Sequence, residues 1–215
     1  MATANCSITG FKYYNGGWLP SSGWSTASSN VSGYGGTSSS TGTTYTAVYQ
    51  FTIPSVSGTV SSGTISFALP WIDGGYSSTF SVNYHITKTA PSTNASVQGT
   101  TVASGSISDT GSNSQQWKTK SFTTGAFNAT TGTYYLYLTG GSMPAEFGGH
   151  LAATLNYSSD SSASTGSTFI KPTASKERDS ISGTSWANYS YDSDCASYDG
   201  GNTIRIGGSN SSKNW

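Results

Sequence analysis

The stretch YTAVYQFTI, from Tyr45 to Ile53, decides the fold because apolar and polar side chains alternate along it. Successive side chains of a β-strand point to opposite faces, so this alternation predicts a strand with one buried face. Only Val48 breaks the polar face. Pro54 ends the strand, because proline has no backbone N–H to donate to a neighbouring strand. The buried face is predicted to carry Tyr45, Ala47, Tyr49, Phe51 and Ile53.

The same alternation returns further along the chain. Its predicted inward residues are Ile65, Phe67 and Leu69 in TISFAL; Phe80, Val82, Tyr84 and Ile86 in FSVNYHI; part of the YYLYL stretch at 134–138; and Leu151, Ala153, Leu155 and Tyr157 in LAATLNY. Weaker strands are predicted at residues 97–104 and 116–122. No long window has a helical period. Strands with one polar face are typical of antiparallel sheets, so we predict an all-β fold, an antiparallel two-sheet sandwich of jelly-roll type.

Composition excludes several classes of partner. The chain has 215 residues, of which only 8% are charged, with nine basic and nine acidic side chains. It therefore lacks the positive field that holds a nucleic acid or an anionic membrane surface. No run approaches the about 20 apolar residues that a membrane-spanning helix needs, so no membrane insertion is expected. An aromatic content of 13% argues for a folded chain.

The chain is predicted to have three parts. Residues 1–157 form the β-sandwich domain, and residues 158–167 are a Ser/Thr-rich linker. Residues 168–215 form a small, incomplete β segment with too few apolar residues for a core of its own. This segment is expected to dock on the sandwich, to be completed by another chain, or to begin a second module.

An acidic stretch near the C-terminus, SYDSDCASYDGGN, is a candidate calcium site. Asp192 and Asp194 have a spacing that aims two carboxylates at one ion, and Asp199 could complete the set. The alternative is a solvated acidic turn, because Asp-Gly followed by Gly is an ordinary turn signal. No other cofactor is expected. Cys195 lies between aspartates, which disfavour a reactive thiolate, and we expect Cys6 and Cys195 to be unbridged thiols.

Motifs of catalysis are absent from the sequence. There is no G-x-S-x-G elbow, no H-E-x-x-H, no phosphate-binding loop and no C-x-x-C. His85 and His150 alternate with inward residues, so both are predicted to lie on polar strand faces. We therefore expect no catalytic residues and no enzymatic activity.

Aromatic residues among glycines and serines give the strongest site signal. FKYYNGGWLPSSGW contains Trp18 and Trp24, and LPWIDGGYSS contains Trp71, Asp73 and Tyr76 in what reads as a loop. A sugar ring has an apolar C–H face and polar edges, so aromatic rings beside an acidic or amide group suit glycan binding. These five residues are the predicted glycan site. The alternative is that the rings close the ends of the sandwich or line a subunit contact.

The stretches GYGGTSSSTGTTYTAVYQFTIPS, GTISFALPW, TTGTYYLYLTGG and HLAATLNYS, which span about residues 30–157, resemble the β-sandwich modules of minor structural, tail-fibre and baseplate-associated proteins of bacteriophages and prophages. The C-terminal GGNTIRIGGSNSSKNW is similar to the opening of jelly-roll repeats in bacterial surface and virion proteins, but it stops before their long strand. The resemblance implies virion architecture or host-surface binding, oligomeric assembly and no catalysis, and it transfers no catalytic residue.

These observations lead to one functional expectation. The protein is expected to be a non-enzymatic structural component of a virion, associated with a tail, a fibre or a capsid, located on the virion or an extracellular surface. Its expected partners are copies of itself or other virion proteins, with cell-surface glycans as a further ligand. Two alternatives stay open: a secreted carbohydrate-active enzyme domain or carbohydrate-binding module, and a bacterial cell-surface adhesin.

Overall fold

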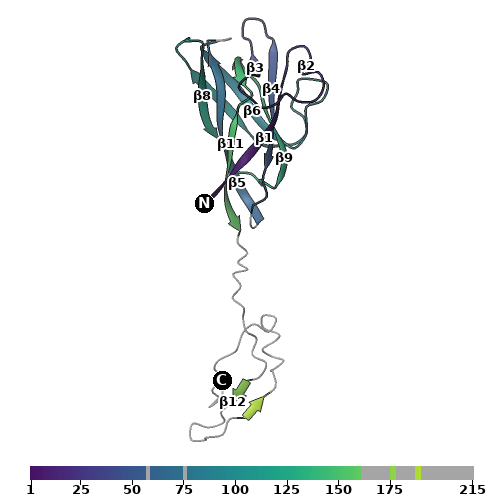
Figure 1. The fold of residues 1–215 in the computed structure, drawn as a ribbon, viewed down its shortest axis with the longest axis vertical. Helices are drawn as coiled ribbons and strands as arrows, with labels where there is room; N and C mark the ends of the chain where they lie inside the picture. The colour runs from purple at the N-terminus through teal and green to yellow at the C-terminus, as the bar shows by residue number, and fades with distance from the viewer. Residues whose placement is uncertain (57–58, 75–76, 161–174, 178–186, 190–215) are drawn as a thin grey trace. The chain divides into compact units, whose positions relative to one another are not determined.

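The computed structural model describes residues 1–56, 59–74, 77–160, 175–177 and 187–189 (Figure 1). The chain divides into two compact units, Met1–Ser162 and Ala163–Trp215. In the second unit the described residues form two short antiparallel strands, β12 (Ser175–Glu177) and β13 (Ala187–Tyr189). Most of the predicted linker and C-terminal segment lies outside the described residues.

The described part of the first unit is built from strands and contains no helix, which confirms the all-β prediction. Among the described residues, therefore, no helix has the length and apolar character needed to cross a membrane. The strands are β1 (Ala2–Tyr14), β2 (Trp18–Leu19), β3 (Ser32–Thr37), β4 (Thr44–Ile53), β5 (Thr59–Asp73), β6 (Thr79–Thr87), β7 (Thr101–Thr110), β8 (Gln116–Thr123), β9 (Gly132–Met143), β10 (Ala145–Gly148) and β11 (Ala152–Asp160).

Six of these strands close into a barrel, in the order β1–β11–β5–β10–β3–β4 and back to β1. The hydrogen bonding therefore does not separate into the two predicted sheets. The reason is the length of β1, whose N-terminal half, Ala2–Cys6, pairs with β11 while its C-terminal half, Ser7–Tyr14, pairs with β4. A register shift between Ile8 and Gly10 marks the point where this strand passes from one side to the other.

Further strands widen the barrel on two sides. Strands β9, β6 and β7 continue outward from β4, and we call this side, with the C-terminal half of β1, the β4 wall. Strand β8 adds to β5, and we call β8, β5, β11 and the N-terminal half of β1 the β5 wall. In Figure 1, β8 and β11 lie on one side of the first unit and β4 and β9 on the other.

The core lies between the two walls and is made of the residues that the alternation predicted. The inward residues of β4, β5, β6 and β11 are buried, with the single exception of Tyr45, which is half-buried. Aromatic rings pack across the core, for example Phe51 edge-on against Phe67 and stacked against Tyr134, at centroid distances of 5.6 and 5.8 Å. Burial of this apolar surface is the main source of stability in such a fold.

Four strands of the first unit, β1, β2, β3 and β10, were not predicted from the sequence. Strand β1 was missed because its bulge interrupts the alternation. Strand β3 was missed because it contains Gly33, Gly35 and Gly36, and glycine normally weakens a strand. At Gly33 a Cβ atom would lie 2.3 Å from the ring of Tyr13, so that close contact requires glycine. The weaker strands are present, the first displaced to Thr101–Thr110 and the second at Gln116–Thr123.

Candidate functional site

Trp71 lies inside the core, so its predicted role in glycan binding is corrected. The stretch that reads as a loop is the end of β5, and Trp71 has 0% exposure. Its ring packs edge-on against Phe80 at 4.9 Å, and its Nε1 donates a hydrogen bond to Asp109 Oδ2 at 3.2 Å. A ring without an exposed face cannot stack on a sugar.

Asp73 is also fully buried, and its carboxylate holds the loop between β7 and β8. The backbone N–H groups of Ser112 and Asn113 donate to it at 2.9 Å, and the Ser114 hydroxyl donates at 2.8 Å. Burial alone would raise the pKa of Asp73, but these hydrogen bonds outweigh it and hold the pKa well below its usual value. Lys118 Nζ lies 3.7 Å away. Asp73 is therefore a structural carboxylate, and its predicted contact with a sugar is corrected too.

Several predicted site residues lie outside the described residues. They are Tyr76 of the glycan set and Asp192, Asp194 and Asp199 of the calcium set, so both assignments stay predictions for them. Within the described ranges, no group of three or more His, Cys, Asp or Glu side chains is placed to hold a metal ion. Cys6 is buried, which raises the pKa of its thiol to about 11.

Trp18 and Trp24 are brought together by the way the chain folds back along β1. Strand β2 pairs with the end of β1, which places Trp18 opposite Tyr14. Ser25 then exchanges two backbone hydrogen bonds with Phe11, at 3.0 and 3.1 Å. The two indole rings consequently flank one ammonium group: Lys12 Nζ lies 5.7 Å from the ring centroid of Trp18 and 5.1 Å from that of Trp24.

Two tyrosines complete this group, and we call the five side chains the Lys12 cluster. Tyr14 meets Trp18 edge-on at 5.3 Å, and Tyr135 of β9 stacks with Trp24 at 5.7 Å with an interplanar angle of 26°. All five side chains are half-buried, so each keeps part of its surface in contact with solvent. The cluster consists of Lys12, Tyr14, Trp18, Trp24 and Tyr135.

Trp24 reaches this position because Gly10 lies beneath it. A Cβ atom at Gly10 would be 2.8 Å from Cβ of Trp24, which is closer than real side chains approach. Glycine at this position of β1 thus lets the indole lie across the strand toward β9. The sequence offers a signal for Lys12 and Tyr14, which stand in the same FKYYNGGW stretch as Trp18, but none for Tyr135.

Lys12 has an unusual environment for a surface cation. Its ammonium lies over two rings, which attract it through cation–π interactions, and partial burial lowers its pKa. In the part of the chain that the structure describes, the ion pairs join Lys118 to Asp73 and Lys120 to Asp109, and no carboxylate pairs with Lys12. The cluster therefore combines flat aromatic rings with a hydrogen-bond donor. A sugar ring can bind both, because its C–H face packs against an aromatic ring and its hydroxyls accept hydrogen bonds.

His85 lies on an outer strand face as predicted, but His150 lies in the connection between β10 and β11 and not on a strand. His85 of β6 is half-buried opposite Tyr137, and burial lowers its pKa. His150 is exposed and meets Trp117 of β8 edge-on at 5.3 Å. Glu146 accepts a hydrogen bond from the Ser32 hydroxyl.

Comparisons with known proteins give no match, either to a protein-family model or among curated proteins. The case for a function rests on the site itself.

Proposed function

We propose that this protein is a non-enzymatic structural component of a virion or another extracellular surface, in which the Lys12 cluster binds glycans. The observation that carries this proposal is a cluster of four aromatic rings from β1, β2, the following loop and β9, two of which, Trp18 and Trp24, flank one ammonium group. Three of the rings come from residues 14–24 and the fourth from β9, and all four side chains lie outside the core with part of their surface exposed.

The chemistry of the cluster favours sugars over other ligands. An indole face packs against the C–H face of a pyranose, and an ammonium group donates hydrogen bonds to ring hydroxyls or to a sugar carboxylate. Lys12 meets no acidic side chain among the described residues, so its donors are open to such a group. Acidic sugars should therefore bind this cluster more tightly than neutral ones.

Composition supports the assembly part of the proposal. Only 8% of the residues are charged, and the chain contains 14 tyrosines. Tyrosine gives large contact area at low entropic cost in protein interfaces. Copies arranged on one particle would turn weak sugar contacts into strong attachment through avidity. We also propose that the first unit is a β-domain of jelly-roll type, like the structural modules of phages that its sequence resembles.

A glycan array with neutral and acidic sugars tests the binding site. Trp18→Ala should weaken retention of the bound glycan about ten-fold, the loss expected when an aromatic hot spot is truncated. Leu19→Ala is the matched control, because Leu19 stands next to Trp18 on β2 with 45% exposure and has no ring. Equal retention by both variants would overturn the assignment, and hydrolysis of a bound glycan would overturn the non-enzymatic role.

A further inference from the structure

The outer face of the β5 wall carries a row of small polar side chains across four strands. Asn5 of β1 lies opposite Thr154 of β11, Thr154 opposite Ser66 of β5, and Ser66 opposite Thr123 of β8. Hydrogen bonds run along this row: the hydroxyls of Ser66 and Thr123 are 3.0 Å apart, and Asn156 Nδ2 donates to Ser66 Oγ at 2.9 Å. The face is therefore an ordered array of hydroxyl and amide groups.

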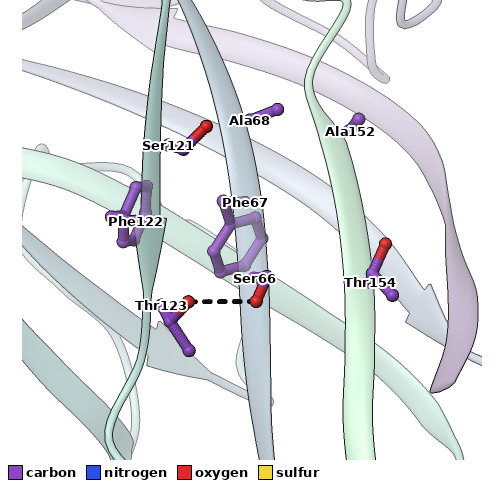
Figure 2. A pocket seen from close by; sticks show the side chains of 8 residues that line it. All are labelled: Ser66, Phe67, Ala68, Ser121, Phe122, Thr123, Ala152 and Thr154. Carbon is purple, nitrogen blue, oxygen red and sulfur yellow. Dashed lines mark hydrogen bonds between the residues drawn. The ribbon is translucent and has the colours of Figure 1, made fainter.

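A hollow of about 360 Å³ opens on this face between β8, β5 and β11 (Figure 2). It exists because Ala68 and Ala152 stand beside the polar row and leave space where larger side chains would fill it. Figure 2 shows the hydroxyls of Ser66, Ser121 and Thr123 around this space. The volume falls in the range of about 300–1,000 Å³ that is typical of small-molecule sites.

An exposed aromatic pair stands at one end of the same face. Trp117 is 41% exposed and shares the outer face of β8 with Ser121 and Thr123, because exposed and half-buried residues alternate along that strand. Trp117 and Ser121 are four positions apart, which is about 13 Å along an extended strand. His150, two residues before Ala152, meets the Trp117 ring edge-on. An apolar platform and a hydroxyl-lined hollow therefore lie on one strand face, within the span of a short saccharide chain.

No charged side chain lines this hollow. The two lysines of β8 turn to the other side of the strand, where Lys118 lies 3.7 Å from Asp73 and Lys120 lies 3.8 Å from Asp109. A charged ligand would find no counter-ion here. A protein partner would need an apolar interface centre, whereas the apolar side chains that line this hollow are Phe67, Ala68, Phe122 and Ala152, interspersed with the hydroxyls, and the exposed ring of this face, Trp117, lies at its end. A ligand with many uncharged hydroxyls and a C–H face matches these groups.

We propose that the outer face of β8, β5 and β11 is a second binding site, which takes an uncharged saccharide chain. Trp117 is the stacking platform, and the hydroxyls of Ser66, Ser121 and Thr123 exchange hydrogen bonds with the sugar. This inference deepens the proposed function and rests on it, but it assigns different residues and a different sugar class from those of the Lys12 cluster.

Affinity gel electrophoresis with mannan, laminarin and soluble starch as neutral probes, and alginate as the acidic probe, tests this site. Trp117→Ala and Ser121→Arg should each reduce retardation by at least one neutral polysaccharide about ten-fold. Ser121→Arg introduces bulk and charge on an exposed strand face, so it blocks the hollow without touching the core. Thermal unfolding of each variant reports that the fold is retained.

Trp18→Ala distinguishes the two proposals. If the second site is correct, this variant keeps its retardation by the neutral probe while Trp117→Ala and Ser121→Arg lose it. If Trp18→Ala alone loses retardation, the second site is wrong and the Lys12 cluster stands. A wild-type protein that none of the neutral probes retards overturns the second site, and alginate binding that is sensitive to Trp18→Ala would still support the first.

Discussion

The two walls of the barrel have outer faces of opposite character, although both come from the same alternating pattern. On the β4 wall the outward residues Thr46, Val48 and Tyr137 have 0% exposure. On the β5 wall the outward residues Ser121 and Thr123 are exposed. The first face is covered around these three residues, although its β1 end carries the partly exposed Lys12 cluster, and the second face is open at β8. Outward-pointing side chains therefore hold structure together where chain covers them and are accessible to a ligand where it does not.

The cover of the β4 wall comes from chain segments between strands. The connection between β6 and β7, residues 88–100, lies over this wall: Thr46 Oγ1 donates to the carbonyl of Ala95 at 2.9 Å, and the Tyr137 hydroxyl donates to the carbonyl of Thr89 at 3.0 Å. Trp24 lies over the β1 end of the same wall. Outward polarity in a strand therefore does not by itself show that a residue meets solvent.

Removing the largest outward side chain of the covered wall should have the largest effect on stability. Tyr137→Ala is expected to lower the free energy of unfolding by about 3–5 kcal/mol, because it leaves a cavity under residues 88–100 and removes one of the hydrogen bonds to the carbonyl of Thr89. Trp117→Ala on the open wall should cost less than about 1 kcal/mol, since that ring is 41% exposed. Urea unfolding measures both, and equal losses would contradict the contrast between the walls.

Displacing Trp24 should have the next largest effect. Gly10→Val places methyl groups where Trp24 lies, and we expect a loss of about 1–3 kcal/mol, typical of overpacking, together with a change in tryptophan fluorescence. Gly125→Val is the control, because no atom lies within 4 Å of a Cβ there. If both variants unfold at the same urea concentration, the position of the Trp24 ring does not depend on glycine at residue 10.

Cutting one hydrogen bond between the β4 wall and its cover should have a smaller effect. Thr46→Val keeps the shape of the side chain but loses the hydroxyl that donates to the carbonyl of Ala95 and also lies 3.0 Å from Thr139 Oγ1, so we expect a loss of about 1 kcal/mol. Thr123→Val makes the same change on the open wall, where water can replace the lost contact, and should change stability by less than about 0.5 kcal/mol. A larger loss for Thr123→Val would reverse the comparison.

The smallest effect should be a dependence on pH at His85. Burial lowers the pKa of His85 below its ordinary 6.5, so the unfolded chain takes up a proton before the folded one does. The stability gained from neutral His85 is full above pH 6.5 and declines as the pH falls from 6.5 toward the folded pKa. His85→Gln should flatten this decline in thermal midpoints measured across that window. If the thermal midpoint of His85→Gln declines with the same slope as that of the wild type, other titrating groups cause the loss of stability.

Particular residues show how far sequence reasoning reached. The inward set of β4, β5, β6 and β11 followed from alternation, because the two faces of a strand are a local property. Trp71 and Asp73 were misassigned because LPWIDGGY has the composition of a loop. The partners that bury Asp73 lie about 40 positions away, in the loop between β7 and β8, and no local pattern links the two segments.

The candidate sites were predicted only in part. Trp18 and Trp24 were predicted from their turn-rich stretch, which also contains Lys12, but Tyr135 joined them only through the pairing of β1 with β4 and of β4 with β9. Trp117 and the hydroxyl row were missed, since a serine or threonine at every second position is the ordinary outer face of a strand. Their signal is the register, which lines up Asn5, Thr154, Ser66 and Thr123.

The sequence by itself determined which side chains of the main strands face inward, because successive residues of a strand alternate whatever surrounds it. Only the tertiary structure decided that β1 closes a ring, that part of the β4 wall is covered and that the outer face of β8 is open. These features depend on contacts between residues far apart in the chain, such as Thr46 with Ala95 and Trp24 with Tyr135. Val48 illustrates both contributions. In the sequence it is the one apolar residue on the predicted polar face of its strand, and in the structure that position is covered and has 0% exposure, which suits an apolar side chain.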